Sequence, residues 1–214
     1  MGTLAVLHTT PSTISSISEI CQNLLPGVRV DNYLDESVLR QINAEGEISC
    51  GARYRFYEIV SLAAAAKPDA ILCACSSVGG MLEEARSFVS VPLFRIDEPM
   101  ARAAAERRGR TVVCATLAST LNPTLEIIAR YAPDAQKPEA LFISEAARYM
   151  SADRERYLST IASALEDAVL KFDTVVLAQA SMAQAAQRLP LTLREKLLTS
   201  PESGVAQLKE VFGV

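Results

Sequence analysis

The sequence predicts an α/β protein made of two pseudo-symmetric lobes, each with a parallel sheet, and a site in the cleft between the lobes. Short apolar runs alternate with longer helical patterns, which is typical of parallel βα units. Two segments also recur. DAILCACSS at residues 69–77 returns as DTVVLAQAS at 173–181, and AVLHTTPST at 5–13 returns as VVCATLAST at 112–120. The offsets of 104 and 107 residues nearly agree, which favours a duplicated α/β unit.

The first lobe is expected to span residues 1–97. Its pattern predicts strands over 4–7, 28–33, 70–74 and 91–96, helices over 14–24, 53–66 and 81–88, and a loop around Gly46 and Gly51. Pro26 and Gly27 end the first of these helices, and Pro68 ends the second.

The second lobe is expected to span residues 98–190, after a hinge at 97–99. Its pattern predicts helices over 100–107, 124–131 and 152–171 and strands over 111–115, 140–143 and 174–177. In the long helix, Tyr157, Ile161 and Leu165 have the spacing of one buried face. Residues 191–212 are helical in pattern, and the segment 191–214 is expected to pack back on the first lobe.

Composition excludes several classes of protein. The 21 basic and 25 acidic side chains give no cationic field for nucleic acid and no polybasic membrane patch. No apolar run reaches the roughly 18 residues that a membrane span needs, and the N-terminus enters a strand pattern without a charged leader, so we expect a cytoplasmic location. Five cysteines, an odd number, predict reduced thiols, and a single histidine argues against a zinc cluster. Homo-oligomer formation stays open.

The loops after four predicted strands are rich in hydroxyl groups. In open parallel sheets, ligands bind outside the carboxyl ends of the strands, so we expect these loops to face one crevice. Cys75 begins one of them, where free backbone N–H groups would favour a thiolate or hold a carboxylate. A small carboxylic acid is therefore the expected ligand, with Cys75 as the reactive group. The expected binding residues are His8, Thr9, Ser76, Ser77, Thr116, Ser119, Thr120, Gln179 and Ser181.

Each of these residues also has a structural interpretation. Cysteines in apolar strands are often simply buried, and Cys73 and Cys114 are assigned to the core. His8, alone at a strand end, could be hydrogen-bonded scaffolding, and any single Ser or Thr could be a helix cap. Gly79 and Gly80 are too few for a phosphate loop, and no dinucleotide-binding or P-loop motif occurs.

Three motifs in this order resemble the aspartate/glutamate/hydantoin racemase superfamily over nearly the whole chain. AILCACSS at 70–77 is similar to the family's first cysteine motif, an apolar strand followed by Cys-Asn-Thr, and this maps the catalytic thiol onto Cys75. VCATLAST at 113–120 resembles its Gly-Thr-x-Ala-Thr substrate loop. VLAQAS at 176–181 takes the place of its Leu-Gly-Cys-Thr-His motif, but Gln179 replaces the cysteine and Ser181 the histidine.

The resemblance implies two α/β halves and a cofactor-independent racemase that uses two thiols. Glutamine cannot exchange a proton near neutral pH, so Gln179 excludes the symmetric two-cysteine reaction. Three enzymatic reactions stay open: racemisation or epimerisation with another second group such as His8, cis–trans isomerisation by addition of Cys75, and decarboxylation with one thiol as proton donor. A non-catalytic paralogue that binds a small acid is the alternative from another class. No metal, flavin or pyridoxal site is visible in the sequence.

Overall fold

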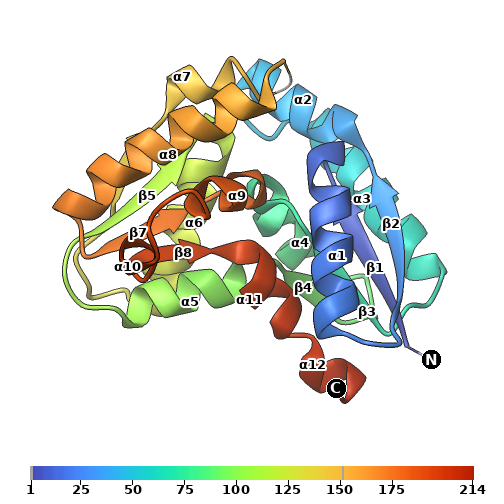
Figure 1. The fold of residues 1–214 in the computed structure, drawn as a ribbon. Coiled ribbons are helices and arrows are strands. Elements are labelled where there is room, and N and C mark those ends of the chain that lie inside the picture. Colours follow the sequence, from blue (N-terminus) through green and yellow to red (C-terminus); the bar gives the residue numbers. More distant parts are fainter. Residues whose placement is uncertain (1, 151) are drawn as a thin grey trace. The chain divides into compact units, whose positions relative to one another are not determined.

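Within the residues that the structure describes, eight short strands form two four-stranded sheets, and every pair of neighbouring strands is parallel (Figure 1). This computed structural model describes residues 2–150 and 152–214. The chain divides into unit 1, residues 1–98 and 201–214, and unit 2, residues 99–200. The predicted α/β class with two parallel-sheet lobes is confirmed.

Unit 1 carries the sheet order β2-β1-β3-β4. Its strands are β1 (Thr3–His8), β2 (Arg29–Leu34), β3 (Ala70–Cys73) and β4 (Leu93–Arg95). Its helices are α1 (Ile14–Leu24), α2 (Glu36–Glu45), α3 (Cys50–Ala65), α4 (Gly79–Ala85), α11 (Ser200–Ala206) and α12 (Lys209–Phe212), with 3-10 turns η1 (Pro11–Thr13) and η2 (Ser76–Val78).

Unit 2 carries the order β6-β5-β7-β8. Its strands are β5 (Thr111–Ala115), β6 (Glu139–Phe142), β7 (Thr174–Leu177) and β8 (Leu197–Thr199). Its helices are α5 (Glu98–Glu106), α6 (Ala118–Tyr131), α7 (Ser144–Ala147), α8 (Arg154–Lys171), α9 (Ala183–Ala186) and α10 (Leu191–Arg194), with the 3-10 turn η3 (Ala180–Met182).

The two sheets repeat each other in topology and in register. In unit 1, β1 pairs with β3 so that Leu4 lies beside Ala70. Adding the sequence offsets of 107 and 104 to these two residues gives Thr111 and Thr174, which are paired partners of β5 and β7 in unit 2. The same offsets relate Thr9 to Thr116 and Cys75 to Gln179. The duplication read from the sequence is therefore a duplication of strand pairing.

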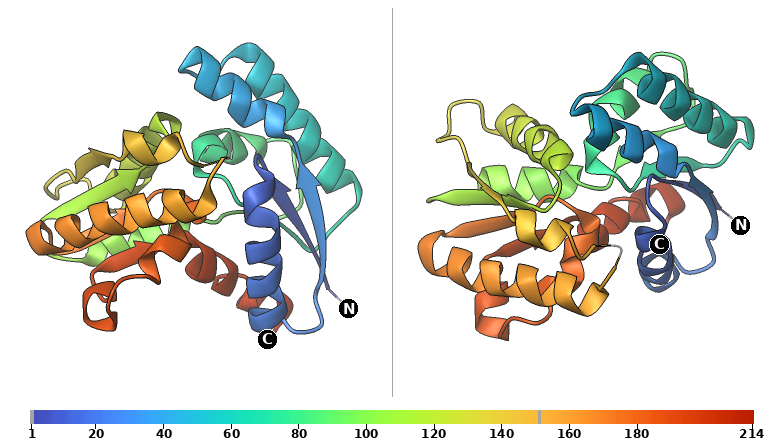
Figure 2. Two further views of the ribbon diagram at one scale, coloured as in Figure 1. Left: turned by 45° about the horizontal axis from the view of Figure 1, so that its top comes forward. Right: turned by 90° about the horizontal axis from the view of Figure 1, so that it is seen from above.

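The two central strands of each sheet are buried on both faces, as is usual in parallel sheets. In unit 1, alternate residues of β1 and β3 face opposite sides: Ala5 and Ile71 pack with α2, α3 and α4, whereas Leu4 and Leu72 pack with α1 and the C-terminal segment. In unit 2, Val112 and Val175 face α8, and Val113 and Val176 face α5 and α6. The helices on both sides of each sheet can be followed in Figure 2.

The structure adds a helix where the sequence analysis expected a loop. Asp35 caps α2 by accepting a hydrogen bond from the Ser37 N–H at 2.9 Å, and Gly46 ends the helix with a φ of 76°. Val38 and Ile42 are buried at helical spacing. The sequence analysis missed this helix because its signals, one capping residue and a few apolar residues at helical spacing, are short and directly follow a strand.

Two further differences concern the second half. The sequence predicted a helix over 124–131, but α6 begins at Ala118 and continues through Pro123. The Thr124 hydroxyl donates to the Thr120 carbonyl at 2.9 Å. Residues 197–199, read as part of a terminal helix, form β8 and pair with β7, so the segment that belongs to unit 1 begins at residue 201 and not at 191. The sheet offers Leu197 hydrogen-bonding and apolar partners that outweigh its local helical pattern.

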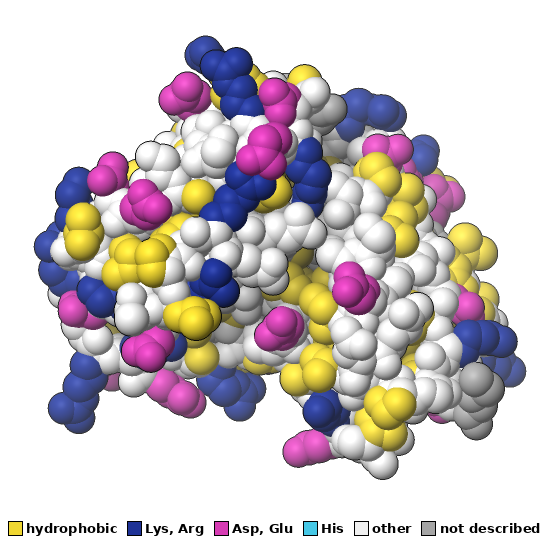
Figure 3. All heavy atoms as spheres, in the orientation of Figure 1, with side chains coloured by type: hydrophobic (Ala, Val, Ile, Leu, Met, Phe, Trp, Pro, Cys, Tyr) yellow, Lys and Arg dark blue, Asp and Glu magenta, His cyan; other side chains and the backbone are white. Residues whose placement is uncertain are grey.

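Charged side chains of both signs are interspersed on the face shown in Figure 3, in line with a net charge of −4. Among the described residues, no helix combines the length and the apolar character that crossing a membrane requires.

Candidate active site

Cys75 lies two residues after the end of β3 and immediately before η2. Its sulfur is close to the backbone N–H groups of Ser77 and Val78, the hydroxyl of Ser77 and the hydroxyl of Thr9. Thr9 comes from the end of β1, which lies beside β3 in the sheet. The pairing of these strands therefore brings together the two predicted site loops of unit 1.

Two opposing effects act on the Cys75 thiol. Burial raises its pKa, whereas the Thr9 and Ser77 hydroxyls and the Ser77 and Val78 N–H groups lower it, and the net direction is upward. The residue is nevertheless partly exposed. The sequence analysis expected the N–H groups to favour a thiolate. The donors are present, but burial outweighs them, so the pKa of the Cys75 thiol lies above its ordinary value.

The Thr9 hydroxyl is buried and makes no hydrogen bond of normal geometry among the described residues. It is nonetheless close enough to the Cys75 sulfur to lower the thiol's pKa. A buried hydroxyl without a partner costs free energy unless it serves a ligand or a charged neighbour. Thr9 is therefore placed to stabilise negative charge on Cys75.

A buried ion cluster packs against the start of α4, the helix that follows the Cys75 turn. Arg95, at the end of β4, donates to Asp97 through Nε and Nη2, each at 2.9 Å, and through Nη1 to Glu83 at 2.7 Å. Arg95 and Asp97 are almost fully buried, and their pairing raises the pKa of Arg95. A Cβ at Gly79, the first residue of α4, would overlap the guanidinium. Gly79 thus lets Arg95 pack directly against the helix that follows Cys75.

His8 is held between two side chains. Its Nδ1 lies 2.8 Å from Thr13 Oγ1 and its Nε2 lies 2.9 Å from Asn32 Oδ1. The ring is buried, and burial lowers its pKa, so His8 is neutral at pH 7. With both nitrogens engaged, the geometry favours scaffolding over proton transfer.

In unit 2, the position related to Cys75 is filled by an amide whose oxygen is tightly bound. Gln179 Oε1 accepts hydrogen bonds from the Thr116 N–H at 2.6 Å, the Thr116 hydroxyl at 3.0 Å and the Leu117 N–H at 3.1 Å. Thr116 follows β5 and Gln179 follows β7, two paired strands. The predicted pair Thr116 and Gln179 is thus brought together within one unit.

A model of the Asp/Glu/hydantoin racemase family matches residues 6–208. The chain belongs to this family. The membership confirms the predicted family and the predicted enzyme class, an isomerase of the racemase type. A sequence search of curated proteins gives no match.

Solved structures of racemases share the fold. Picrophilus torridus aspartate racemase gives a TM-score of 0.74 at 14% identity, covering 100% of this chain and 95% of that one. Bacillus anthracis glutamate racemase RacE1 gives 0.72 at 16% identity, covering 99% and 82%. Klebsiella pneumoniae allantoin racemase gives 0.67 at 18% identity, covering 100% and 88%. At such identities the likeness concerns the fold alone.

Tyr157 of unit 2, which the sequence analysis assigned to the core, has a hydroxyl group that reaches the site loops. Tyr157 of α8 is 1% exposed, and its hydroxyl lies 3.1 Å from Ser181 Oγ and 3.4 Å from Thr116 Oγ1. Its spacing in the helical pattern correctly predicted burial, but it did not predict which groups the hydroxyl would contact. A tyrosine on an otherwise aliphatic face was the available signal.

The other predicted residues of this racemase-family chain lie in the same loops. Thr120 is buried and donates to the Leu117 carbonyl at 2.7 Å, so it closes its own turn. Ser76 is buried within η2, and Ser119 is partly exposed at the start of α6. Their roles as substrate ligands stay predictions.

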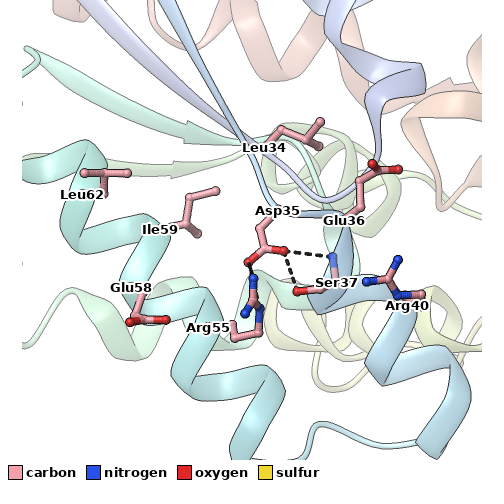
Figure 4. Close-up of a pocket in the computed structure, with 9 residues that line it drawn as sticks. All are labelled: Leu34, Asp35, Glu36, Ser37, Arg40, Arg55, Glu58, Ile59 and Leu62. Carbon is pink, nitrogen blue, oxygen red and sulfur yellow. Dashed lines mark hydrogen bonds and ion pairs between the residues drawn. The ribbon is translucent and has the colours of Figure 1, made fainter.

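A pocket of about 520 Å³ in unit 1 lies elsewhere, between α2 and α3 (Figure 4). Asp35 at its centre accepts from Ser37 and from Arg55, so its carboxylate is already paired and the pKa of Asp35 is lowered. The described lining contains none of the predicted site residues of this racemase-family chain. It consists of Leu34, Asp35, Glu36, Ser37, Arg40, Arg55, Glu58, Ile59 and Leu62.

Proposed function

We propose that the protein is a cofactor-independent racemase or epimerase of a small carboxylate, such as an amino acid, a dicarboxylate or a hydantoin-type compound, and that Cys75 is its reactive thiol. The observation that carries the proposal is the set of donors around the Cys75 sulfur, from Thr9, Ser77 and Val78. Such donors stabilise a sulfur that carries negative charge. Family membership supplies the class of reaction.

In the proposed reaction, the minor thiolate form of Cys75, which the donors of Thr9, Ser77 and Val78 stabilise, removes the proton from the carbon next to the carboxylate. The electron pair of the C–H bond moves into the carboxylate to give an enediolate, and Cys75 becomes a thiol. A water molecule gives a proton to the other face of the carbon, which completes the inversion, and the hydroxide left behind takes the proton from Cys75 and restores the thiolate. Substrate binding is proposed for His8, Thr9, Ser76, Ser77, Thr116, Ser119, Thr120, Gln179 and Ser181.

A reaction that needs only one proton donor is the alternative. In a decarboxylation, the bond to the departing carbon dioxide breaks, its electrons form an enediolate, and the Cys75 thiol gives its proton to carbon. The upward net direction of the Cys75 pKa favours this reaction, because it requires a thiol. Cis–trans isomerisation instead requires the thiolate, which adds to a double bond, allows rotation and is then eliminated.

The test is incubation of the protein in D₂O with aspartate, glutamate, hydantoin, malonate and maleate, followed by ¹H NMR. Loss of the α-hydrogen signal supports racemisation, carbon dioxide release with acetate formation supports decarboxylation, and fumarate supports cis–trans isomerisation. If these compounds bind without turnover, the protein is a small-acid binding paralogue. A cytoplasmic location and the lack of a nucleic-acid partner stay predictions from composition.

A further inference from the structure

The amide of Gln179 has one end fixed and one end without a partner. Its oxygen accepts three hydrogen bonds, two of them from the backbone N–H groups of Thr116 and Leu117. Its nitrogen makes no hydrogen bond to residues 2–150 and 152–214 and reaches solvent, although the residue as a whole is only 8% exposed. An N–H₂ group that reaches solvent from an otherwise buried and fixed side chain is available to an acceptor oxygen of a ligand.

The orientation of this amide is determined by its surroundings. Rotating the group by 180° would place the nitrogen against two backbone N–H groups, which can only donate. Oε1 must therefore face Thr116 and Leu117, and Nε2 must face away from them. Whatever occupies the remaining side of Gln179 meets two N–H donors.

The hydroxyl groups beside Gln179 form a chain with one direction. Thr116 gives its hydroxyl proton to Gln179 Oε1, so toward Tyr157 it can only accept. Tyr157 then gives its single proton to Thr116 and accepts from Ser181. Three hydroxyl protons thus point toward the amide oxygen, and such chains polarise the groups at their ends. The polarisation strengthens the N–H₂ donors of Gln179.

We propose that Gln179 is a fixed hydrogen-bond donor to an anionic oxygen of the substrate, a carboxylate or the enediolate formed from it, and that Tyr157 is the positioning residue that holds this donor in place. The inference rests on the proposed function and adds a role for Gln179. At the position where a second cysteine would exchange a proton, Gln179 instead stabilises negative charge on a substrate oxygen. The oxygen that Gln179 binds must be an acceptor, so an ammonium group does not fit there.

The test measures malonate binding by calorimetry to the wild type, Gln179→Met, Tyr157→Phe and the control Gln187→Met. Gln187 is exposed in the same unit, so its variant reports any general effect of the substitution. Methionine keeps the length of glutamine but has no N–H. We expect Gln179→Met to weaken malonate binding by about ten- to a hundredfold, the usual range for a hydrogen bond to a charged group, and Gln187→Met to leave it unchanged.

A spectroscopic readout separates positioning from folding. The side-chain amide ¹H–¹⁵N signal of Gln179, assigned by its absence in Gln179→Met, should shift on addition of malonate and should lie at a different position in Tyr157→Phe, which keeps the ring. Equal malonate affinity of wild type and Gln179→Met, or a signal that saturating malonate does not move, would overturn the inference alone. Failure of the wild type to bind malonate, acetate and hydantoin would overturn the proposed function as well.

Discussion

Thr116 binds the side-chain oxygen of Gln179 twice, through its backbone N–H at 2.6 Å and through its hydroxyl at 3.0 Å. The duplication relates Thr116 to Thr9 and Gln179 to Cys75, and in unit 1 the Thr9 hydroxyl acts on the Cys75 sulfur. One threonine position therefore serves a thiol in one unit and an amide in the other. The two units share the same strand pairing, but only the thiol of Cys75, and not the amide of Gln179, can exchange a proton with a substrate.

Replacing Thr9 by valine should make Cys75 less reactive. The substitution removes a donor that lowers the thiol's pKa while keeping the shape of the side chain, so iodoacetamide should alkylate Cys75 roughly two- to tenfold more slowly at pH 8. The matched control is Thr10→Val, the same change at the next residue, whose hydroxyl pairs with Ser12. Equal alkylation rates for Thr9→Val and Thr10→Val would show that Thr9 does not act on the sulfur.

Alkylation of Cys75 should rise with pH and show no plateau below pH 9. Burial raises its pKa above 9.0, so the thiolate is a minor species at pH 7 and its fraction grows about tenfold per pH unit up to that pKa. Mass spectrometry of the Cys75 peptide between pH 6.5 and 10 measures this rate. A plateau at or below pH 8 would mean that the four donors outweigh burial.

Adding one methyl group at Gly79 should destabilise unit 1. The new Cβ would overlap the Arg95 guanidinium, which its carboxylate partners hold in place, and we expect a loss of about 1–3 kcal/mol in urea unfolding. Gly80→Ala is the control, because a Cβ there meets no atom within 4 Å. Within a helix that change should stabilise by about 0.5–1 kcal/mol. Equal stability of the two variants would contradict the packing of Arg95 against α4.

His8 should make folding stability depend on pH in a defined direction. Its folded-state pKa lies below 6.5, so as the pH falls through 6.5 the unfolded chain takes up a proton first and stability is lost. Above pH 6.5 both states are neutral at His8 and the effect is absent. Urea unfolding at pH 7.5 and pH 5 should show a smaller loss for His8→Gln than for wild type. An equal loss would mean that the His8 pKa is not lowered.

The fold could be predicted from the sequence because its signals are strong and repeated. Apolar runs such as 70–74 and 174–177 are buried on both faces of a sheet, and the duplicated segments implied the shared strand order. The wrong predictions fall where the local sequence pattern favours one secondary structure and packing in the folded protein favours another. Residues 197–199 follow a helical pattern but form the edge strand of a sheet, and α6 continues through Pro123, a residue type that usually interrupts a helix.

The sequence predicted which loops carry the candidate site residues, but it did not predict the direction of the Cys75 pKa shift. The sequence placed Cys75, Thr9, Thr116 and Gln179 at strand ends, but the sign of the Cys75 pKa shift depends on how much protein surrounds the sulfur. Periodicity assigned Tyr157 to the core correctly without revealing that its hydroxyl reaches the loop. Such long-range contacts follow from packing between distant segments, which no local pattern encodes.

The role of Cys75 is tested most directly by the α-hydrogen exchange rate in D₂O of Cys75→Ala and Cys50→Ala, measured by ¹H NMR on the substrate that the wild type accepts. Cys50 is exposed at the start of α3 and serves as the matched control. We predict that Cys75→Ala reduces exchange at least a thousandfold while Cys50→Ala keeps the wild-type rate, since removing a nucleophile or base commonly costs several orders of magnitude. Exchange by Cys75→Ala at a rate within tenfold of wild type would contradict the account.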